Sequence, residues 1–455
     1  MLFSCASVAT QQEQYEQSIP LVRQGEYVQA AEIIESAKGV SYVEKDRVLF
    51  YLDLGMVLHW AGDYEGSNEA LSKAEQGIED LYTKSVSKAV ASGLLNDNAL
   101  DYSGEDYEDI YLNVFKALNY IALGDEDAAR VEIRRVQIKL NLLDDKYKDL
   151  VEEYNSSEGA EAELVYRENQ FHNDVLSRYL SLLLYRAEGS VDDARIDRDL
   201  MDEAWKTQSH IYRFDKPDFP PLEFSEDGLA HVNVLSFTGL GPVKLAETLY
   251  LDTGPDIVYI TMTGQDDDYV SDLVGFNFLF VPGIDGGMHF KIQFPKLSSR
   301  RSEADRVVVR LDGEVVAELP LLEKLENVAR ETFLLKQPVT VAKTIVRATL
   351  KNVAKEIGKD ALQDSLADQG DGGFFLGVLA GFAADVAVDA TENADLRIAQ
   401  FFPAEAWAGE FTVEPGIYDV VVEYWNGSTL MEEESYGEME FLANELNLIE
   451  SHVLR

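Results

Sequence analysis

The sequence predicts an α+β protein of several domains, with an all-α N-terminal half built from helical repeats and a C-terminal half of strands and helices. Residues 14–206 show helical periodicity and contain a single proline, Pro20. A short glycine-centred phrase recurs four times within this span. After the prolines of residues 214–221, short β-rich runs bounded by turn residues replace the helical pattern. These three observations place a helical domain before a strand-rich one.

The recurring phrase is expected to join the helices in pairs. In its clearest copy, Gly62-Asp63-Tyr64, a glycine is followed by an acidic residue and an aromatic residue, with alanines behind. We expect the glycine to end the first helix in a left-handed conformation and the acidic residue to favour the N-terminus of the second. The aromatic ring would fill the gap between the helices, and the small alanine would let them approach. The residues assigned to this turn are Gly25, Tyr27, Ala30, Gly62, Tyr64, Gly124, Ala129, Gly189 and Ala194.

This phrase resembles the turn between the two helices of a tetratricopeptide repeat, so residues 14–210 are interpreted as a tetratricopeptide-like helical repeat domain. A regular array of this kind repeats about every 34 residues, and the glycine spacing here is longer and irregular. We therefore expect further helical hairpins near residues 76–98 and 132–155. Two roles are open for the domain: a concave groove that binds a peptide or partner protein, and a spacer that positions the C-terminal half. The acidic stretches 101–109 and 152–163 are predicted to be solvated loops.

The C-terminal half is predicted to contain a mixed strand and helix domain over residues 222–400 and a β-rich module over residues 401–455. The phrase Val413-Glu414-Pro415-Gly416-Ile417-Tyr418 is typical of small β-sandwich modules in bacterial envelope proteins. We therefore expect a β-sandwich-like module at the C-terminus, either alone or as one sandwich with residues 222–320.

Local signals within this half predict individual elements. Asp312-Gly313 and Asn426-Gly427 each stand between two β-rich runs and predict hairpins. Residues 322–358 are expected to form one or two helices, with a break at Gln337-Pro338. Residues 372–390 are the most apolar segment, with glycines every fourth position at Gly373, Gly377 and Gly381. Because Asp385 interrupts the segment before it reaches the length of a membrane span, we expect a buried helix there.

Charge and motifs limit the classes of function. The chain has 39 basic and 83 acidic residues, a net charge of −44 that would repel nucleic acid phosphates, so we expect no nucleic acid partner. No His-Glu-x-x-His sequence, Walker loop or Gly-x-Ser-x-Gly elbow is present. The six histidines are scattered along the sequence. We therefore expect no enzyme activity, no catalytic residue, no metal and no cofactor. A hydrolase that uses two of the many carboxylates is the alternative.

Cys5 is the single cysteine of the chain and follows Leu2-Phe3-Ser4. An apolar residue at minus three and a small residue at minus one before a cysteine resemble a bacterial lipobox. In that interpretation residues 1–13 are a truncated signal with its polar tether, the Cys5 thiol is acylated, and the natural start codon lies upstream of Met1. The alternative is an intracellular protein in which Cys5 has no special role.

Several phrases in a fixed order resemble an uncharacterised family of tetratricopeptide-repeat-containing lipoproteins of Gram-negative bacteria. They are Cys5, Arg178–Tyr185 with Ala194, Gly239–Lys244, Ala342–Ala348, Ala394–Arg397 with Phe402–Glu405, and Pro415–Tyr418. The resemblance covers most of the chain and transfers no catalytic residue. It implies a lipid-anchored protein on the periplasmic face of the outer membrane. It further implies a possible partner in the cell-wall synthesis machinery.

The expected function is therefore that of a non-catalytic, periplasm-facing lipoprotein. It would act as a protein-binding scaffold or assembly factor, with an envelope protein or peptide in its helical groove and its N-terminal lipid in the membrane. The alternative is an enzyme of envelope glycan or peptide metabolism in which the helical repeats recruit a partner.

Acylation of Cys5 can be tested directly. When the gene is expressed with its upstream start restored, we expect a palmitate analogue to label the wild-type chain and not the Cys5→Ala variant. The measurement is in-gel detection of the labelled chain. An unlabelled wild type, or label that persists in Cys5→Ala, contradicts the lipoprotein interpretation.

Overall fold

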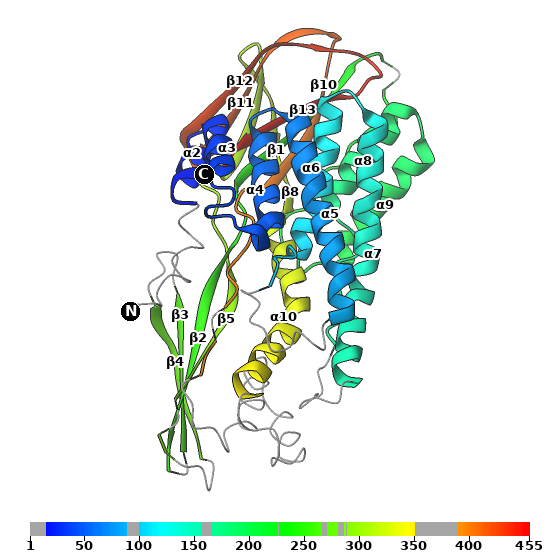
Figure 1. Ribbon diagram of the computed structural model, residues 1–455. Coiled ribbons are helices and arrows are strands. Elements are labelled where there is room, and N and C mark those ends of the chain that lie inside the picture. The colour runs from blue at the N-terminus through cyan, green and yellow to red at the C-terminus, as the bar shows by residue number, and fades with distance from the viewer. Residues whose placement is uncertain are drawn as a thin grey trace.

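The computed structural model (Figure 1) describes residues 15–88, 100–156, 166–225, 227–255, 257–265, 271–280, 286–287, 289–350, 390–392 and 394–455. Cys5 and the glycines at 373, 377 and 381 lie outside these ranges. The N-terminal part is helical and the C-terminal part contains three sheets. The chain is therefore a mixed helix and sheet protein, as the sequence predicted at this coarse level.

The helices of the N-terminal half are α2 (Tyr15–Arg23), α3 (Tyr27–Ser36), η1 (Glu44–Asp46), α4 (Arg47–Trp60), α5 (Tyr64–Lys88), α6 (Asp106–Ala122), α7 (Glu126–Ser156), α8 (Val175–Glu188) and α9 (Val191–Thr207). The later elements are β1 (Ala230–Leu240), β2 (Val243–Gly254), β3 (Ile257–Gln265), β4 (Ser271–Phe280), β5 (His289–Ser298), β6 (Arg306–Leu311), β7 (Glu314–Leu319), β8 (Leu321–Lys324), α10 (Leu325–Leu350), β9 (Ala390–Glu392), β10 (Pro403–Val413), β11 (Gly416–Asn426), β12 (Thr429–Phe441) and β13 (Asn447–Val453).

The four recurring glycines stand at the turns between α2 and α3, α4 and α5, α6 and α7, and α8 and α9. Their φ angles are 77°, 77°, 76° and 80° for Gly25, Gly62, Gly124 and Gly189. A side chain strains this left-handed conformation, which is why glycine ends the first helix of each pair. After two of these turns, the aspartate that follows accepts a hydrogen bond from a backbone N–H of the next helix at 3.0 Å.

The expectation of an extra hairpin within residues 132–155 is wrong. The single helix α7 spans 31 residues through this region. Residues 132–155 contain neither glycine nor proline, so nothing in their backbone favours a turn. The irregular glycine spacing therefore reflects, at least here, a longer second helix.

Three sheets follow the helices, with strand orders β13-β1-β10-β8, β12-β11-β6-β7 and β4-β3-β2-β5-β9. Both predicted hairpins are confirmed: Asp312-Gly313 joins β6 to β7, and Asn426-Gly427 lies at the turn from β11 to β12, where Gly427 and Ser428 stand between the strands. Asp312 and Gly313 both have positive φ, at 48° and 81°, as a two-residue hairpin turn requires. The strands of residues 403–453 pair with β1, β6 and β8, so they share sheets with the region before them.

Strand β1 lies at the centre of the molecule and is buried at all 11 positions. Val232 and Val234 belong to a core shared with the second sheet, whereas Leu235 and Phe237 belong to a core shared with the helices. Since successive side chains of a strand point to opposite faces, the first sheet has the helices on one face and the second sheet on the other (Figure 1). Burial on both faces explains the apolar composition of β1.

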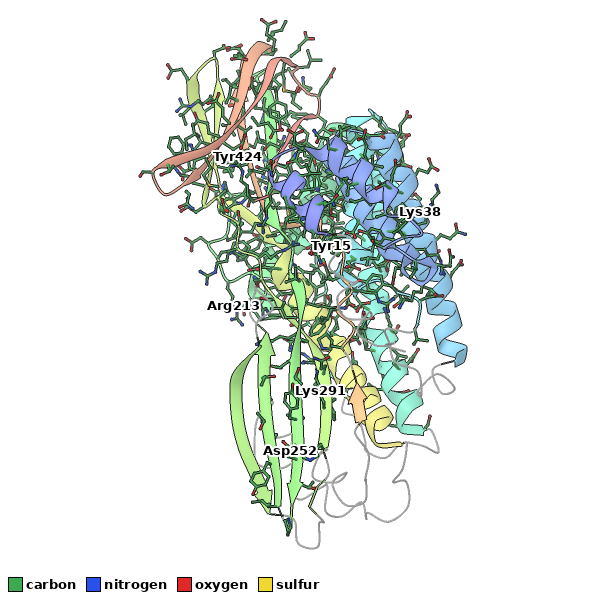
Figure 2. The ribbon with its side chains drawn as sticks, turned by 60° about the vertical axis from the view of Figure 1, so that its left-hand side comes forward. Tyr15, Lys38, Arg213, Asp252, Lys291 and Tyr424 are labelled. Atoms are coloured by element: carbon green, nitrogen blue, oxygen red, sulfur yellow. The ribbon has the colours of Figure 1, made fainter. Side chains whose placement is uncertain are left out.

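The third sheet and α10 extend away from this layered body (Figure 1). Asp252 and Lys291 lie on that sheet, far from Tyr424 in the second sheet (Figure 2). The predicted break at Gln337-Pro338 is wrong, because α10 continues through Pro338 to Leu350. The first turns of α10 are fixed by Val328 and Ala329, which are fully buried. Leu335, three residues before Pro338, is buried as well, so packing holds the turn that leads into the proline.

Candidate functional site

An extended segment of the C-terminal half lies against the helices. We call residues Ala394–Phe402 the strap; it connects β9 to β10 without regular secondary structure. The indole N–H of Trp60 in α4 donates to the carbonyl oxygen of Phe401 at 2.9 Å. Phe401 and Phe402 are both completely buried. The strap therefore occupies the side of the helical layer that faces the first sheet.

Asp53 of α4 holds the centre of the strap. Its Oδ1 atom accepts the backbone N–H of Gln400 at 2.8 Å. The hydroxyl groups of Tyr15 and Tyr42 both donate to Oδ2, each at 2.8 Å. Burial raises the pKa of Asp53 to about 7, although these three donors oppose the shift. Figure 2 shows Tyr15 where the N-terminal helices meet the rest of the body.

Glu108 of α6 holds the neighbouring strap residue. Its Oε1 atom accepts the backbone N–H of Ala399 at 2.6 Å, and Oε2 accepts the hydroxyl of Tyr102 at 2.8 Å. Burial, together with the nearby negative charge of Glu105, raises the pKa of Glu108 to about 7. Two carboxylates from different helices thus hold consecutive backbone N–H groups of one extended segment.

A group of buried ion pairs surrounds this contact. Glu105 accepts from Lys244 of β2 at 2.6 Å and from Lys336 of α10 at 3.0 Å. Burial alone would raise the pKa of Glu105, but the two ammonium groups lower it below its usual range. Arg397 of the strap pairs with Asp46 at 2.8 Å. The helical layer, the third sheet, α10 and the strap therefore meet in one charged network.

A second junction joins α4 to β13. His59 contacts Asn119 through Nδ1 and Glu450 through Nε2, both at 2.6 Å. The ring of His452 packs between Trp60 and Tyr27, with centroid distances of 4.8 and 4.9 Å. Burial lowers the pKa of His452 to about 3, and the charge of His59 adds to this effect.

The assigned repeat-turn residues do not gather at one site. Ala30, Ala129 and Ala194 are fully buried between helices. Tyr27 contacts His452 of β13, and Tyr64 lies 5.9 Å from His59 by ring centroids. At least one of the aromatic residues therefore reaches the C-terminal strands instead of only filling the gap within its own hairpin.

The prediction that residues 101–109 form a solvated loop is wrong. Asp106 begins α6, and Glu105, Asp106 and Glu108 are buried. The physical reason is local pairing, because Glu105 and Glu108 form a capping box at the start of the helix and basic residues from distant elements neutralise the cluster. An acidic run can be buried when its partners come from elsewhere in the chain.

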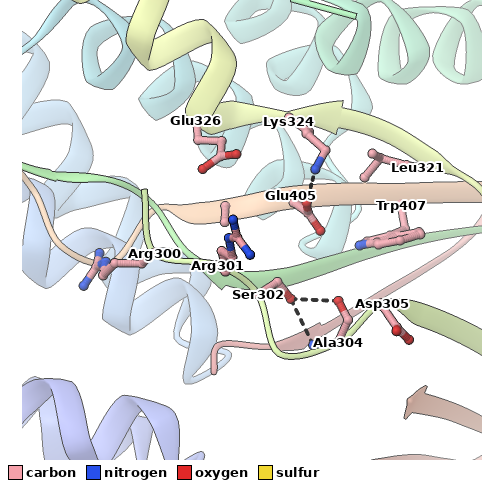
Figure 3. A pocket seen from close by; sticks show the side chains of 11 residues that line it. Arg300, Arg301, Ser302, Ala304, Asp305, Leu321, Lys324, Glu326, Glu405 and Trp407 are labelled. Carbon is pink, nitrogen blue, oxygen red and sulfur yellow. Dashed lines mark hydrogen bonds and ion pairs between the residues drawn. The ribbon is translucent and has the colours of Figure 1, made fainter. Parts of the chain in front are cut away.

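A cavity of about 450 Å³ opens beside the start of β10 (Figure 3). It lies between the loop after β5, the end of β8 with the first turn of α10, and the start of β10. Its lining residues are Arg300, Arg301, Ser302, Ala304, Asp305, Leu321, Lys324, Glu326, Ala404, Glu405 and Trp407. Asp53 and Glu108 do not line this cavity, but Arg300 connects it with the strap by donating to the carbonyl oxygen of Gln400 at 2.7 Å.

A third arrangement has the geometry of a nucleophile, a base and an orienting carboxylate. The Nε2 atom of His231 lies 2.9 Å from Oγ of Ser225, and its Nδ1 lies 2.8 Å from Glu410. However, Nε2 also accepts the backbone N–H of Ser225 at 3.0 Å, and the Ser225 hydroxyl donates to Asp227. Since the lone pair of the histidine is already shared, these contacts give the hydroxyl little activation as a nucleophile.

Within the described ranges, no three His, Cys, Asp or Glu side chains come together as ligands for a metal ion. The helices in those ranges are all too short or too polar to span a bilayer. The candidate sites are therefore the cavity and the Ser225–His231–Glu410 group.

Some of the buried charged residues that the sequence predictions did not identify are nevertheless indicated by local sequence patterns. Asp53 is the single carboxylate in the mostly apolar helix α4, which indicates a buried group with a specific partner. The spacing of Glu105 and Glu108 is that of a capping box. No local pattern identifies the strap, Lys244 or the cavity, because their partners are more than 100 residues away along the chain.

The buried Asp53 should make stability depend on pH. Its pKa lies near 7 in the folded chain, against an ordinary value of 3.8, so between these pH values the folded state binds a proton that the unfolded state has lost. The free energy of unfolding should therefore fall as pH rises through this range. In Asp53→Asn we expect the slope between pH 5 and 7 to become flatter by about 1.4 kcal/mol per pH unit.

The measurement is urea unfolding of both chains at pH 5, 6, 7 and 8. The exposed Asp127 provides a matched control, since Asp127→Asn should leave the slope unchanged. An Asp53→Asn slope equal to that of the wild type would show that Asp53 stays ionised throughout this range.

Comparisons with known proteins give no family from which a function can be transferred to this chain. No protein-family profile, curated protein or solved structure matches the chain.

Proposed function

We propose that this chain is a non-catalytic lipoprotein on the periplasmic face of the bacterial outer membrane, where it acts as a protein-binding scaffold or assembly factor. The lipobox-like Leu2-Phe3-Ser4-Cys5 supports a lipid anchor at Cys5. The ordered phrases that resemble an envelope lipoprotein family support the location. A partner from the cell-wall synthesis machinery is the narrower form of the same proposal.

The proposal includes the finer architecture of the chain. Four helical hairpins with nearly equal φ angles at their turn glycines support a tetratricopeptide-like array. The core shared by the first two sheets supports a β-sandwich-like module. In this architecture the first helices α4, α6 and α8 bond to the C-terminal half, through contacts such as Trp60 with Phe401 and Tyr179 with Asn233. The second helices α5, α7 and α9 would be left to face outward, whereas α3 reaches β13 through Tyr27.

One observation carries the non-catalytic part of the proposal. Carboxyl groups with strongly perturbed pKa values are the usual candidates for acid–base catalysis. Asp53 and Glu108 have such values, yet both are completely buried and both bind the backbone of the strap. Their pKa shifts therefore accompany a structural contact instead of a substrate site.

The strap also changes where a partner would bind. The strap covers the face of the helical layer that packs against the first sheet. A partner protein or peptide would therefore bind to the outward-facing helices or in the cavity beside Arg301. Outward surface is available on α7, where Val131, Ile138 and Leu142 have 46%, 55% and 58% of their area exposed.

An enzyme of envelope glycan or peptide metabolism is the alternative, and the Ser225–His231–Glu410 group is the observation that favours it. A serine nucleophile of this kind reacts with a fluorophosphonate. We expect the wild-type chain to stay unlabelled by such a probe, because the His231 lone pair is shared with a backbone N–H. Labelling of the wild type that disappears in Ser225→Ala would favour the enzyme.

The scaffold role is tested by photocrosslinking in intact envelopes. A photoreactive residue is placed at Ile138 on α7 or at Ile417 on β11, which are 55% and 61% exposed. We expect a discrete crosslink to an envelope protein from one of these faces, lost when Cys5→Ala removes the anchor. Mass spectrometry identifies the partner and the contact face. An anchored chain that gives no crosslink from either position contradicts the scaffold proposal.

A further inference from the structure

The cavity beside Arg301 contains charges of both signs. Three cations and three anions line it, and most of them have partners within the protein. Lys324 and Glu405 form an ion pair at 2.7 Å. The carboxylate of Asp305 accepts the backbone N–H of Gly427 at 3.0 Å. These groups shape the cavity, but their hydrogen-bonding capacity is already partly used.

Arg300 is also engaged. Its Nε atom donates to the carbonyl oxygen of Gly241 at 2.6 Å and its Nη2 atom donates to that of Gln400 at 2.7 Å. These bonds connect the cavity wall to the end of β1 and to the strap. Arg300 is therefore a fixed part of the wall.

Arg301 and Glu326 are the remaining charged residues of the cavity lining. Neither side chain forms a hydrogen bond or an ion pair with the other residues that the structure describes. Arg301 is exposed and Glu326 is half-buried, and both line the same cavity. Figure 3 shows the Arg301 guanidinium between Glu326 and Ser302. Because the two charges do not pair with each other, a ligand that carries both a negative and a positive group could bridge them.

The remaining lining fits a small organic ligand. Trp407 and Leu321 add apolar surface, and the Trp407 ring is held in place by its N–H bond to Thr238 at 3.0 Å. Small-molecule sites of about 300–1,000 Å³ combine such apolar walls with a few placed polar groups. At about 450 Å³ this cavity is in the lower part of that range, which suits a ligand of two or three amino acid residues.

We propose that this cavity binds a short peptide with free ends, its carboxylate on Arg301 and its ammonium group on Glu326. Guanidinium groups bind carboxylates through two parallel hydrogen bonds, and a carboxylate accepts from an ammonium group. The balanced lining disfavours ligands with only one sign of charge. This inference rests on the proposed function, since it supplies the ligand class for one binding surface of the scaffold.

The test is isothermal titration calorimetry on the full chain with the substitution Cys5→Ala. The three ligands are triglycine, N-acetyl-triglycine and triglycine amide. We expect triglycine to bind, and loss of either terminal charge to weaken binding about tenfold or more. Arg301→Gln should abolish the preference for triglycine over its amide. Glu326→Gln should abolish the preference over the N-acetyl form.

Matched controls separate these effects from general changes in charge. Arg213→Gln and Glu314→Gln remove exposed charges outside the cavity and should leave every affinity unchanged. Absence of triglycine binding overturns the proposal, as does equal binding of all three peptides. Binding of N,N′-diacetylchitobiose in place of the peptides would assign the cavity to sugars and also overturn it. A chain that still crosslinks in envelopes but binds no triglycine would retain the scaffold role and lose this inference.

Discussion

The strap is held against the helices by hydrogen bonds from its backbone to two buried carboxylates, and the rest of the structure depends on this contact. Asp53 and Glu108 accept the N–H groups of Gln400 and Ala399. A carboxylate in an apolar interior costs several kcal/mol of desolvation, so it persists only where donors surround it. The strap supplies some of those donors, and the two carboxylates satisfy strap N–H groups that would otherwise be buried without a partner. These hydrogen bonds join the helical layer to the segment that leads into the first sheet.

The same contact sets the geometry of the cavity. Gln400 binds Asp53 through its N–H and Arg300 through its carbonyl oxygen, so one residue connects the interior network with the cavity wall. Pro403 then begins β10, whose next residues line the cavity. Arg300 and Gln400 thus fix the part of the wall that lies next to Arg301 in the sequence.

The segments Gly239–Lys244 and Ala394–Glu405 meet at this point. The backbone N–H of Gly241 donates to the carbonyl oxygen of Phe402 at 2.7 Å, and Lys244 donates to that of Arg397 at 2.9 Å. A Cβ atom at Gly241 would stand 3.1 Å from the Phe402 oxygen, so glycine permits the close approach. Two segments that lie far apart in the sequence therefore build the junction between strap and sheet.

The sequence by itself determined the local elements: the glycine turns between helices, the two hairpins at Asp312-Gly313 and Asn426-Gly427, and the change from helices to strands after residue 214. Each of these follows from the backbone preferences of a few neighbouring residues. Only the tertiary structure decided that α10 passes through Pro338, that Glu105 and Glu108 are buried, and that the strap covers the helices. The burial of Glu105 depends on Lys244 and Lys336, which lie more than 100 residues from it in the sequence. The free energy of a buried charge is set by its neighbours in space, and sequence proximity does not reveal them.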